Sequence, residues 1–341
     1  MSAFPEDTSA LDAWAAQHVA GYQGPSEAIK YPTGQSNPTY RIETPGGAYV
    51  LRCKPPGKLL KSAHMVEREF RVLRALETAG FPAPRALALC EDGNVAGSVF
   101  YLMAHVEGRI LWDPGLADSP REERAGIYDA MNAGLAQLHD IDIAKAGLSD
   151  YGKPGNYYAR QAQRWTEQYR ASETRKIPDM DALIDWLAAN MPPDDGRVSL
   201  VHGDFRIDNM IFAHDSTRLL AVLDWELSTL GHPFADLAYQ AMQWRLPNSG
   251  DFRGLGGLDR AALGIPSDED YVAAYCRRRG LDGVPHWSFL IAFSFFRIAA
   301  IVQGVYKRAL DGNASNPQRG LKMGEGVPLM AQLAMEEVAR A

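Results

Sequence analysis

The chain has 341 residues, 46% of them hydrophobic and 23% charged, and its formal net charge is −7. This length can bury a sizeable core and is typical of two domains or two lobes. The mildly acidic balance offers no basic surface for nucleic acid or for an anionic membrane, so we expect neither as a partner.

Cysteine usage and the apolar runs predict a cytoplasmic protein. Three widely spaced cysteines without a C-x-x-C pair predict reduced thiols, with no disulfide framework and no zinc site. Residues 1–10 lack the basic and apolar regions of a secretory signal. The longest apolar run, residues 289–302, contains Arg297 and is too short to cross a bilayer, so it predicts a buried core helix.

A loop rich in small polar residues stands near the N-terminus. Gly34, Ser36 and Asn37 lie in this loop, directly before two predicted strands at residues 39–42 and 48–52. Backbone N–H groups of such a loop can bind a triphosphate, although loops of this composition also occur without a ligand. Neither G-x-G-x-x-G nor a Walker A sequence is present.

The second predicted strand ends on a basic residue. Arg52 lies at that end and Lys54 follows on the same face, so the sequence leaves open which cation would face a ligand. An arginine stays charged and can bind phosphate with two parallel hydrogen bonds. The next predicted helix, residues 64–76, carries Glu67 and Glu69 near its start, either as partners of that cation or as a solvated face.

Two further strands, residues 86–90 and 99–103, are followed later by a cationic, aromatic segment at residues 151–172. In that segment Arg160 and Arg164 are four residues apart, which places them on one face of a helix. The two arginines could receive an anionic substrate, and a solvated helix face would have the same pattern.

The clearest chemical pattern surrounds a predicted β-hairpin with strands at residues 210–212 and 219–223. Its polar residues follow the spacing H-x-D-x-x-x-x-N, and a second Asp comes directly after the hairpin: His202, Asp204, Asn209 and Asp224. A kinase needs one carboxylate facing the acceptor hydroxyl and others holding Mg²⁺, so the pattern predicts phosphoryl transfer. The alternative is an Asp-rich surface loop that only turns the chain.

The last third of the chain predicts helices. One helix opens near residue 231 and contains Asp236, and a Gly-rich loop is expected at residues 253–266. Three more helices are expected after it: residues 268–279, 287–310 and 323–340.

Three motifs resemble those of the aminoglycoside phosphotransferase-like family of small-molecule kinases. They are His-Gly-Asp at residues 202–204, Asn209, and an apolar residue followed by Asp-Trp-Glu at residues 223–226. Residues 34–40, 51–57, 151–156 and 225–233 are similar to the subgroup whose animal members are fused to an acyl-CoA dehydrogenase. The resemblance implies an α+β, protein-kinase-like two-lobed fold.

That fold would consist of an antiparallel-sheet, nucleotide-binding lobe at residues 1–106 and a mostly helical catalytic and substrate lobe at residues 107–341. ATP would bind between the lobes with Mg²⁺, and its γ-phosphoryl group would pass to a hydroxyl of a small molecule. A hydroxy acid or hydroxyacyl-CoA is the acceptor that the subgroup implies. A monomer or a homodimer, ATP or GTP preference, and one or two metal ions all stay open.

By the same resemblance, the residues of the central pattern receive separate roles. Asp204 would accept the proton of the acceptor hydroxyl, and Arg206 would approach the γ-phosphate. Asn209 and Asp224 would bind Mg²⁺, and Asp236 would tie the following helix to the catalytic loop.

The resemblance also assigns the nucleotide contacts. Arg52 would hold the α- and β-phosphates, with Glu69 as its partner. Backbone groups of Ala104 and Val106 would read adenine, and Met103 would lie behind the base or simply belong to the core.

Substrate contacts are the least constrained assignment. The candidates are two arginines of one helix and two residues after the second Asp: Arg160, Arg164, Trp225 and Glu226. An antibiotic kinase is an alternative function, since acidic residues that could meet a polycation are present: Asp251, Asp268, Glu269 and Asp270. A non-catalytic nucleotide-binding pseudokinase is the other alternative.

Overall fold

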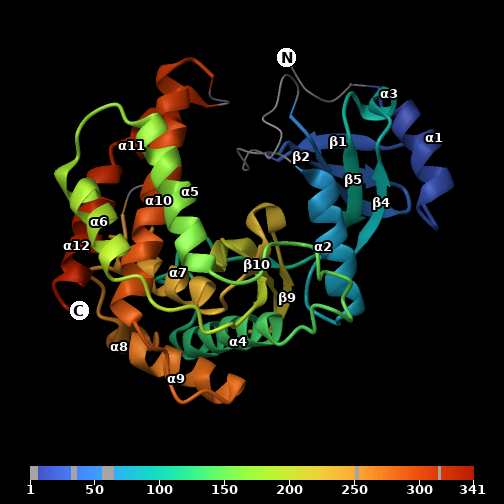
Figure 1. Cartoon of the computed structure of the whole chain (residues 1–341). Helices are drawn as coiled ribbons and strands as arrows, with labels where there is room; N and C mark the ends of the chain where they lie inside the picture. Colours follow the sequence, from blue (N-terminus) through green and yellow to red (C-terminus); the bar gives the residue numbers. More distant parts are fainter. Residues whose placement is uncertain (1–6, 32–36, 56–64, 250–252, 314–315) are drawn as a thin grey trace.

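The N-terminal part of the chain is built around a five-stranded antiparallel sheet (Figure 1). The structure, a computed structural model, describes residues 7–31, 37–55, 65–249, 253–313 and 316–341. The strands follow the order β1-β2-β3-β5-β4, with bounds β1 Glu27–Lys30, β2 Thr39–Thr44, β3 Gly47–Cys53, β4 Ala86–Cys90 and β5 Phe100–Ala104. The helices beside the sheet are α1 Ser9–His18, α2 Val66–Thr78 and α3 Gly93–Ala96.

The alternation of side chains along each strand gives this sheet two different faces. Leu51 and Cys53 of β3 are buried on the face that shares a core with Leu11 of α1. Arg52 points to the opposite face, where its cross-strand partner on β5 is Tyr101. The basic residue of β3 therefore lies on the side of the sheet where α2 packs.

Helix α2 connects the sheet to the helical part of the chain. Val72 and Leu76 belong to its buried stripe and to the same core as the C-terminal helices. One turn before Val72, Arg68 donates a hydrogen bond to the Ser228 carbonyl at 3.3 Å. The Arg68 guanidinium also lies 3.6 Å from the centroid of the Tyr151 ring, which is a cation–π contact. These contacts tie α2 to the helical part of the chain.

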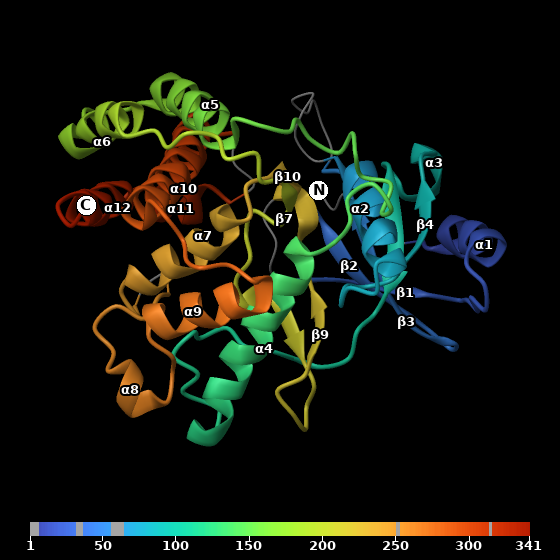
Figure 2. The ribbon, with the colours of Figure 1, turned by 60° about the horizontal axis from the view of Figure 1, so that its bottom comes forward.

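The remainder of the chain is mostly helical (Figures 1 and 2). Its helices are α4 Arg121–His139, α5 Tyr157–Ser172, α6 Pro178–Ala189, α7 Phe234–Arg245, α8 Arg260–Leu263, α9 Asp268–Arg279, α10 Trp287–Leu310, α11 Pro317–Gly324 and α12 Val327–Val338. A three-stranded sheet has the order β6-β8-β9, with β6 Arg109–Ile110, β8 Met210–Phe212 and β9 Leu219–Val222. A two-stranded pair joins β7 Ser199–Val201 to β10 Thr229–Gly231, and short 3-10 helices are η1 Ile207–Asn209 and η2 Trp225–Leu227.

Helix α10 is the central element of this helical part. It is the one described helix that is long and apolar enough to cross a membrane by length and composition, yet 78% of its most apolar window is buried inside the protein. It packs against α5, α7, α11 and α12. Such burial is typical of a core helix, as the sequence predicts for this run.

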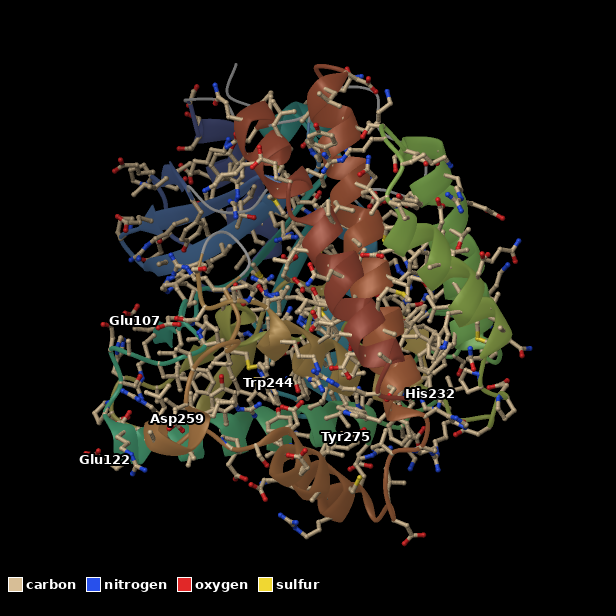
Figure 3. All side chains as sticks on the ribbon, turned by 90° about the vertical axis from the view of Figure 1, so that its left-hand side faces the viewer. Glu107, Glu122, His232, Trp244, Asp259 and Tyr275 are labelled. Atoms are coloured by element: carbon tan, nitrogen blue, oxygen red, sulfur yellow. The ribbon has the colours of Figure 1, made fainter. Side chains whose placement is uncertain are left out.

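Aromatic side chains fill the space between α4, α7 and α9. The ring of Trp244 lies 4.8 Å from that of Tyr271 and 5.7 Å from that of Tyr128, both in edge-to-face geometry. Figure 3 shows Trp244 among closely packed side chains, whereas Glu107 and Asp259 lie at the edge of the molecule. This packing holds the helical part as one core.

Two predicted elements at the C-terminal end differ from the structure. The predicted loop at residues 253–266 contains the short helix α8, which begins where the Asp259 side chain accepts a hydrogen bond from the Ala262 backbone N–H. The helix expected at residues 323–340 begins later, as α12, and the helix before it, α11, was not expected from the sequence. Gly324 ends α11 in close contact with the Tyr306 ring, and α12 starts afresh with Pro328 in its first turn, where a proline is tolerated.

Candidate active site

The candidate site forms where the loop after β7 meets the end of the β8–β9 hairpin. Met210 pairs with Val222 across the hairpin, so Asn209 and Leu223 stand side by side at its open end. The Leu223 backbone N–H donates to the Asn209 carbonyl at 2.8 Å. Asp224, the next residue, is thereby brought beside the loop that contains Asp204.

Asp204 is held in a fixed orientation by two donors. The Tyr239 hydroxyl donates to its Oδ1 at 2.7 Å, and the Asn209 Nδ2 donates to its Oδ2 at 3.0 Å. The Asp204 side chain is still 25% exposed. Burial raises the pKa of the Tyr239 hydroxyl, so Tyr239 remains a proton donor to the carboxylate. The Asp204 carboxylate therefore has a fixed orientation and is still accessible to a ligand.

His202 supports the loop from behind. Its Nδ1 accepts a hydrogen bond from the Asp204 backbone N–H at 3.1 Å, so the other nitrogen, Nε2, donates to the Leu223 carbonyl at 2.8 Å. Its ring lies 4.6 Å from that of Trp225 in edge-to-face geometry. His202 is fully buried, which suits a scaffold and not a proton carrier.

Trp225 belongs to the same scaffold. Only 2% of it is exposed, and its Nε1–H donates to the Val222 carbonyl at 2.9 Å. A ring packed between His202 and Phe81 presents no free face to a ligand. The sequence-based assignment of Trp225 to the substrate is therefore corrected, because its indole supports the loop instead.

Asp236, at the start of α7, anchors the loop through its backbone. Its two carboxylate oxygens accept hydrogen bonds from the N–H groups of His202 at 2.7 Å and of Gly203 at 2.8 Å. Burial raises the pKa of Asp236, but the hydrogen bonds from His139 and from the His202 backbone lower it by more, so the net pKa lies below its ordinary value. The carboxylate is thus ionised and paired.

We expect Asp236→Ala to lower the free energy of unfolding by about 3 kcal/mol at pH 7, because two buried backbone donors lose a charged acceptor. A depressed pKa in the folded state means that this contribution is complete above the unfolded value of about 3.9 and disappears as the pH falls through the lower folded value. Urea unfolding of wild type and variant from pH 7 to pH 3 measures both effects. The exposed Asp118→Ala is the control, and equal stability of all three proteins at pH 7 would refute the anchoring role.

Arg52 links the sheet to the end of the hairpin. Its Nε lies 2.8 Å from the Glu69 carboxylate, and its Nη2 lies 2.6 Å from Asp224 and 3.3 Å from Glu226. The Arg52 side chain is 12% exposed, so these charges interact with little screening by water. A single guanidinium therefore joins β3, α2 and η2 at one point.

Glu69 is buried, and its carboxylate is held by neutral donors as well. The Asn37 side-chain amide donates to one oxygen at 2.7 Å, and the Tyr101 hydroxyl donates to the other at 3.2 Å. Burial raises the pKa of Glu69 to about 7, while the neighbouring Arg52 lowers it. Asn37, expected to act at a phosphate, thus supports the partner of Arg52.

The structure also distinguishes the two cations that the sequence left open. Lys54 forms an ion pair with Glu67, whereas Arg52 pairs with Glu69 and reaches Asp224. Arg52 is therefore the cation that faces the candidate site.

Arg206 lies beside Asp204 but is engaged elsewhere. Its Nε donates to Asp208 at 2.8 Å and its Nη2 pairs with the second oxygen of the same carboxylate. The distance from its Nε to the Asp204 carboxylate is 3.9 Å. Asp208, which the sequence analysis did not single out, is the residue that orients this arginine.

The strand that leads to the helical part contains the proposed adenine contacts. Met103 is half-buried on the same face of β5 as Tyr101, which is the face that carries Arg52 on β3. The Ala104 N–H is already used, because it donates to the Arg85 carbonyl at 2.9 Å. The N–H of Ala104 is thus not available to adenine, whereas the Ala104 carbonyl and the backbone of Val106 stay predictions.

The remaining predicted residues lie apart from this group or outside the described residues. Gly34 and Ser36 lie outside the described residues. Arg160 donates to the Lys153 and Pro154 carbonyls, and Arg164 lies 5.1 Å from the Trp165 ring centroid. In the described part of the chain, neither arginine is in contact with Asp204 or Asp224.

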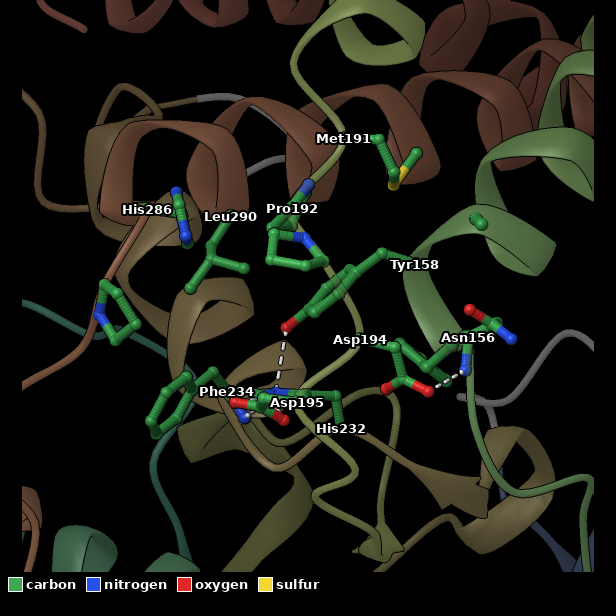
Figure 4. Close-up of a pocket in the computed structure, with 14 residues that line it drawn as sticks. Asn156, Tyr158, Met191, Pro192, Asp194, Asp195, His232, Phe234, His286 and Leu290 are labelled. Carbon is green, nitrogen blue, oxygen red and sulfur yellow. Dashed lines mark hydrogen bonds and ion pairs between the residues drawn. The ribbon is translucent and has the colours of Figure 1, made fainter.

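A cavity of about 170 Å³ opens elsewhere, among the N-terminal ends of α5 and α10 (Figure 4). His232 and Asp195 lie at its wall, with the His232 Nε2 3.2 Å from the carboxylate. In the β7–β10 pair Gly231 lies opposite Ser199, so this cavity is at the end of the pair that is away from Asp204. It is not the candidate active site.

The residues fit a hydrated Mg²⁺ shared with phosphates. The Asp224 side chain is 34% exposed, and the Asn209 amide nitrogen is used toward Asp204, which leaves its oxygen for a cation. Within the described ranges, no group of three or more His, Cys, Asp or Glu side chains forms a complete metal cage. Mg²⁺ in ATP-dependent enzymes needs only one or two protein ligands besides phosphate and water.

This arrangement, on a sheet-plus-helix fold, is that of a kinase-like phosphotransferase for small molecules. The model of the phosphotransferase enzyme family matches residues 27–287, and the chain belongs to that family. A Mus musculus protein, acyl-CoA dehydrogenase family member 10, is 49% identical over 316 residues, which are 92% of this chain and 29% of that protein. The chain therefore spans less than a third of that relative.

Solved structures agree on the fold. A Ralstonia eutropha protein with a provisional aminoglycoside phosphotransferase name is 48% identical, covers 99% of both chains and has a TM-score of 0.88. Spectinomycin phosphotransferase, in complex with ADP and spectinomycin, covers 98% of this chain and 99% of its own, with a TM-score of 0.64 and 13% identity. These matches confirm the protein-kinase-like α+β fold and the family expected from the sequence.

Proposed function

We propose that this protein transfers the γ-phosphoryl group of ATP, with Mg²⁺, to a hydroxyl of a small hydroxy acid or hydroxyacyl-CoA. The observation that carries this function is the placement of two carboxylates. Asp204 is oriented by hydrogen bonds from Tyr239 and Asn209. Asp224 lies just after β9, in contact with Arg52. Phosphoryl transfer requires such separate positions for the acceptor hydroxyl and for the metal-bound phosphates.

Each residue then has a defined task. Asp204 orients the acceptor hydroxyl and takes its proton as the bond to phosphorus forms. Asn209 and Asp224 would hold Mg²⁺, which would neutralise negative charge on the nucleotide's phosphates. Arg52, kept in place by Glu69, binds the α- and β-phosphates, and Arg206 turns from Asp208 toward the γ-phosphate.

We further propose that residues 1–106 form the nucleotide lobe and residues 107–341 the acceptor lobe, with adenine read at Val106. A monomer or homodimer in the cytoplasm is consistent with the composition. The names of the relatives, acyl-CoA dehydrogenase family members, support this proposed acceptor class.

Of the acidic residues that favoured an antibiotic kinase, Asp268 and Asp270 have partners within the described part of the protein. Asp268 is paired with Arg245 at 2.6 Å and with Arg260 at 2.5 Å. Asp270 accepts from Ser267 in the N-terminal cap of α9, and Asp251 lies outside the described residues. This favours a hydroxy acid or its thioester over a polycationic drug.

We expect Arg52→Ala to lower kcat/KM for ATP by about 10- to 100-fold, because a charged contact with the phosphates is worth about 1.5–3 kcal/mol. Arg52→Lys should keep part of the activity, since the charge remains but the bidentate geometry is lost. Lys54→Ala is the matched control from the same strand end and should stay within about twofold of wild type. Damage from Lys54→Ala together with a mild Arg52→Ala would reverse this assignment.

Coupled measurement of ATP consumption tests the function itself. The acceptors are short hydroxy acids, their CoA thioesters and aminoglycosides, each with and without Mg²⁺. We expect Mg²⁺-dependent turnover with the first two classes. ATP consumption stimulated only by aminoglycosides would reject the proposed acceptor.

A further inference from the structure

A buried arginine contacts the loop that contains Asp204. Arg297 of α10 is only 6% exposed, and its Nη2 donates to the Gly203 carbonyl at 2.8 Å. In the described ranges, the structure gives Arg297 no carboxylate partner within ion-pair distance. A buried guanidinium without a counter-charge is costly, and a ligand that supplies one removes that cost.

The position of this arginine relates it directly to the acceptor. Gly203 immediately precedes Asp204, and the Arg297 guanidinium lies 5.5 Å from the centroid of the Tyr239 ring. The Tyr239 hydroxyl in turn holds the Asp204 carboxylate. The Tyr239 side chain therefore contacts both Arg297 and Asp204, the residue proposed to face the acceptor hydroxyl.

The approach of Arg297 depends on a glycine. Gly203 has a φ of +86°, and a Cβ there would lie 3.2 Å from the Arg297 Nη2 and 2.8 Å from the Leu227 carbonyl. The backbone and the space therefore both require glycine at this position. Leu227, which lies beside it, is exposed.

Two further cations lie on the neighbouring helix. Helix α5 packs against α10 and begins with Tyr157. Burial raises the pKa of the Tyr157 hydroxyl, while Arg297 lowers it. Asp236 raises the same pKa, and Arg160 and Arg164 lower it, so three guanidinium groups and one carboxylate act on this hydroxyl. The charged groups that act on Tyr157, where α5 packs against α10, are therefore mainly cationic.

We propose that Arg297 is an acceptor-specificity residue, which pairs with an anionic oxygen group of the acceptor and selects negatively charged hydroxyl compounds over neutral ones. The inference rests on the proposed phosphotransferase function. The anionic group is either the carboxylate of a hydroxy acid or a phosphate of a CoA thioester. Arg160 and Arg164 contribute to the potential that attracts it.

The test compares Arg297→Gln with wild type on three acceptors: 3-hydroxybutyrate, its CoA thioester and its neutral methyl ester. Glutamine keeps an N–H donor for the Gly203 carbonyl but has no charge. We expect KM for the charged acceptors to rise by about 10- to 100-fold, while KM for ATP and for the methyl ester changes less than about threefold. Arg308→Gln, an exposed position on the same helix, is the control and should match wild type.

The two charged acceptors distinguish the source of the anion. A larger effect on 3-hydroxybutyrate assigns the carboxylate, and a larger effect on the thioester assigns the phosphates. Equal losses on the charged acceptors and the methyl ester would mean that Arg297 only supports the loop, which overturns the inference. If Arg297→Gln does not fold, Arg297→Lys applies the same criterion, with a rise of a few-fold expected only for charged acceptors.

A binding measurement separates this inference from the function on which it rests. Calorimetry of 3-hydroxybutyrate and of its CoA thioester, added to the protein with Mg²⁺ and AMP-PNP, requires no turnover. Binding that weakens in Arg297→Gln supports the anion site even if no acceptor is phosphorylated. Equal binding of both ligands to wild type and variant rejects it even if the phosphotransferase activity is real.

Discussion

Asp204→Asn is expected to lower kcat by about 10²- to 10⁴-fold, the usual size of general-base assistance. The substitution should preserve the fold, because asparagine has the same shape and its carbonyl oxygen can still accept from the Asn209 amide. Its NH₂ group meets the Tyr239 hydroxyl, whose oxygen can act as an acceptor. The charge and the proton acceptor are lost, while the contacts that hold the loop remain.

Mg·ATP binding should change little in this variant, because Asp204 faces the acceptor and not the metal. Calorimetry with Mg²⁺ and AMP-PNP, together with turnover assays, separates the two effects. Asp215→Asn is a matched control in the exposed turn of the β8–β9 hairpin and should be fully active. Normal turnover in Asp204→Asn would remove the chemical basis of the kinase assignment.

Asp224→Asn should abolish the dependence of nucleotide binding on Mg²⁺ and lower kcat/KM for ATP by about 10³-fold or more. Asparagine is the informative substitution because Asp224 has a φ of +64°, a region that asparagine adopts more readily than alanine does. The backbone should therefore stay in place, and the effect reports the lost charge. Arg52, which is 2.6 Å from Asp224, keeps Glu69 as a partner.

Titrating Mg²⁺ into the AMP-PNP complex measures this directly. Wild type should bind the nucleotide much more tightly with Mg²⁺ than without it, and Asp224→Asn should bind it equally in both conditions. Retention of the full Mg²⁺ effect in the variant would assign the metal to other residues. Asn209→Ala should lose part of the effect of Mg²⁺ on nucleotide binding, less than Asp224→Asn loses.

The elements that could be predicted from the sequence are those with local signals. The β8–β9 hairpin follows from two apolar runs around a polar turn, and the proximity of Asp204 and Asn209 follows from their spacing in one short loop. Their proposed roles come from the family resemblance. The pairing of Arg52 with Glu69 follows from a strand and the next helix. In each case the residues are close in sequence or belong to neighbouring elements.

The contacts that could not be predicted depend on tertiary packing. The hydroxyl of Tyr239 reaches Asp204 only because α7 packs behind the loop, and no pattern distinguishes this tyrosine from other core aromatics. Arg52 meets Asp224 across 172 residues of sequence. Trp225 was misassigned because proximity to Asp224 in sequence does not determine which way a side chain points.

One error had a readable local cause. Gly324, Gly326 and Pro328 divide α11 from α12, and a proline is compatible only with the first turn of a helix. The predicted helix began at residue 323, before this break, whereas α12 begins at Val327.

Transfer of label from γ-³²P-ATP to an isolated small-molecule product tests the central claim most directly. With wild type, Mg²⁺ and a hydroxy acid or its CoA thioester, the label should appear in an acid-stable phosphomonoester, and Asp204→Asn should form almost none. Label that stays in ATP or appears only as inorganic phosphate, although the protein binds Mg·ATP, would contradict phosphoryl transfer and identify a nucleotide-binding module. Label found only on aminoglycosides would contradict the proposed acceptor.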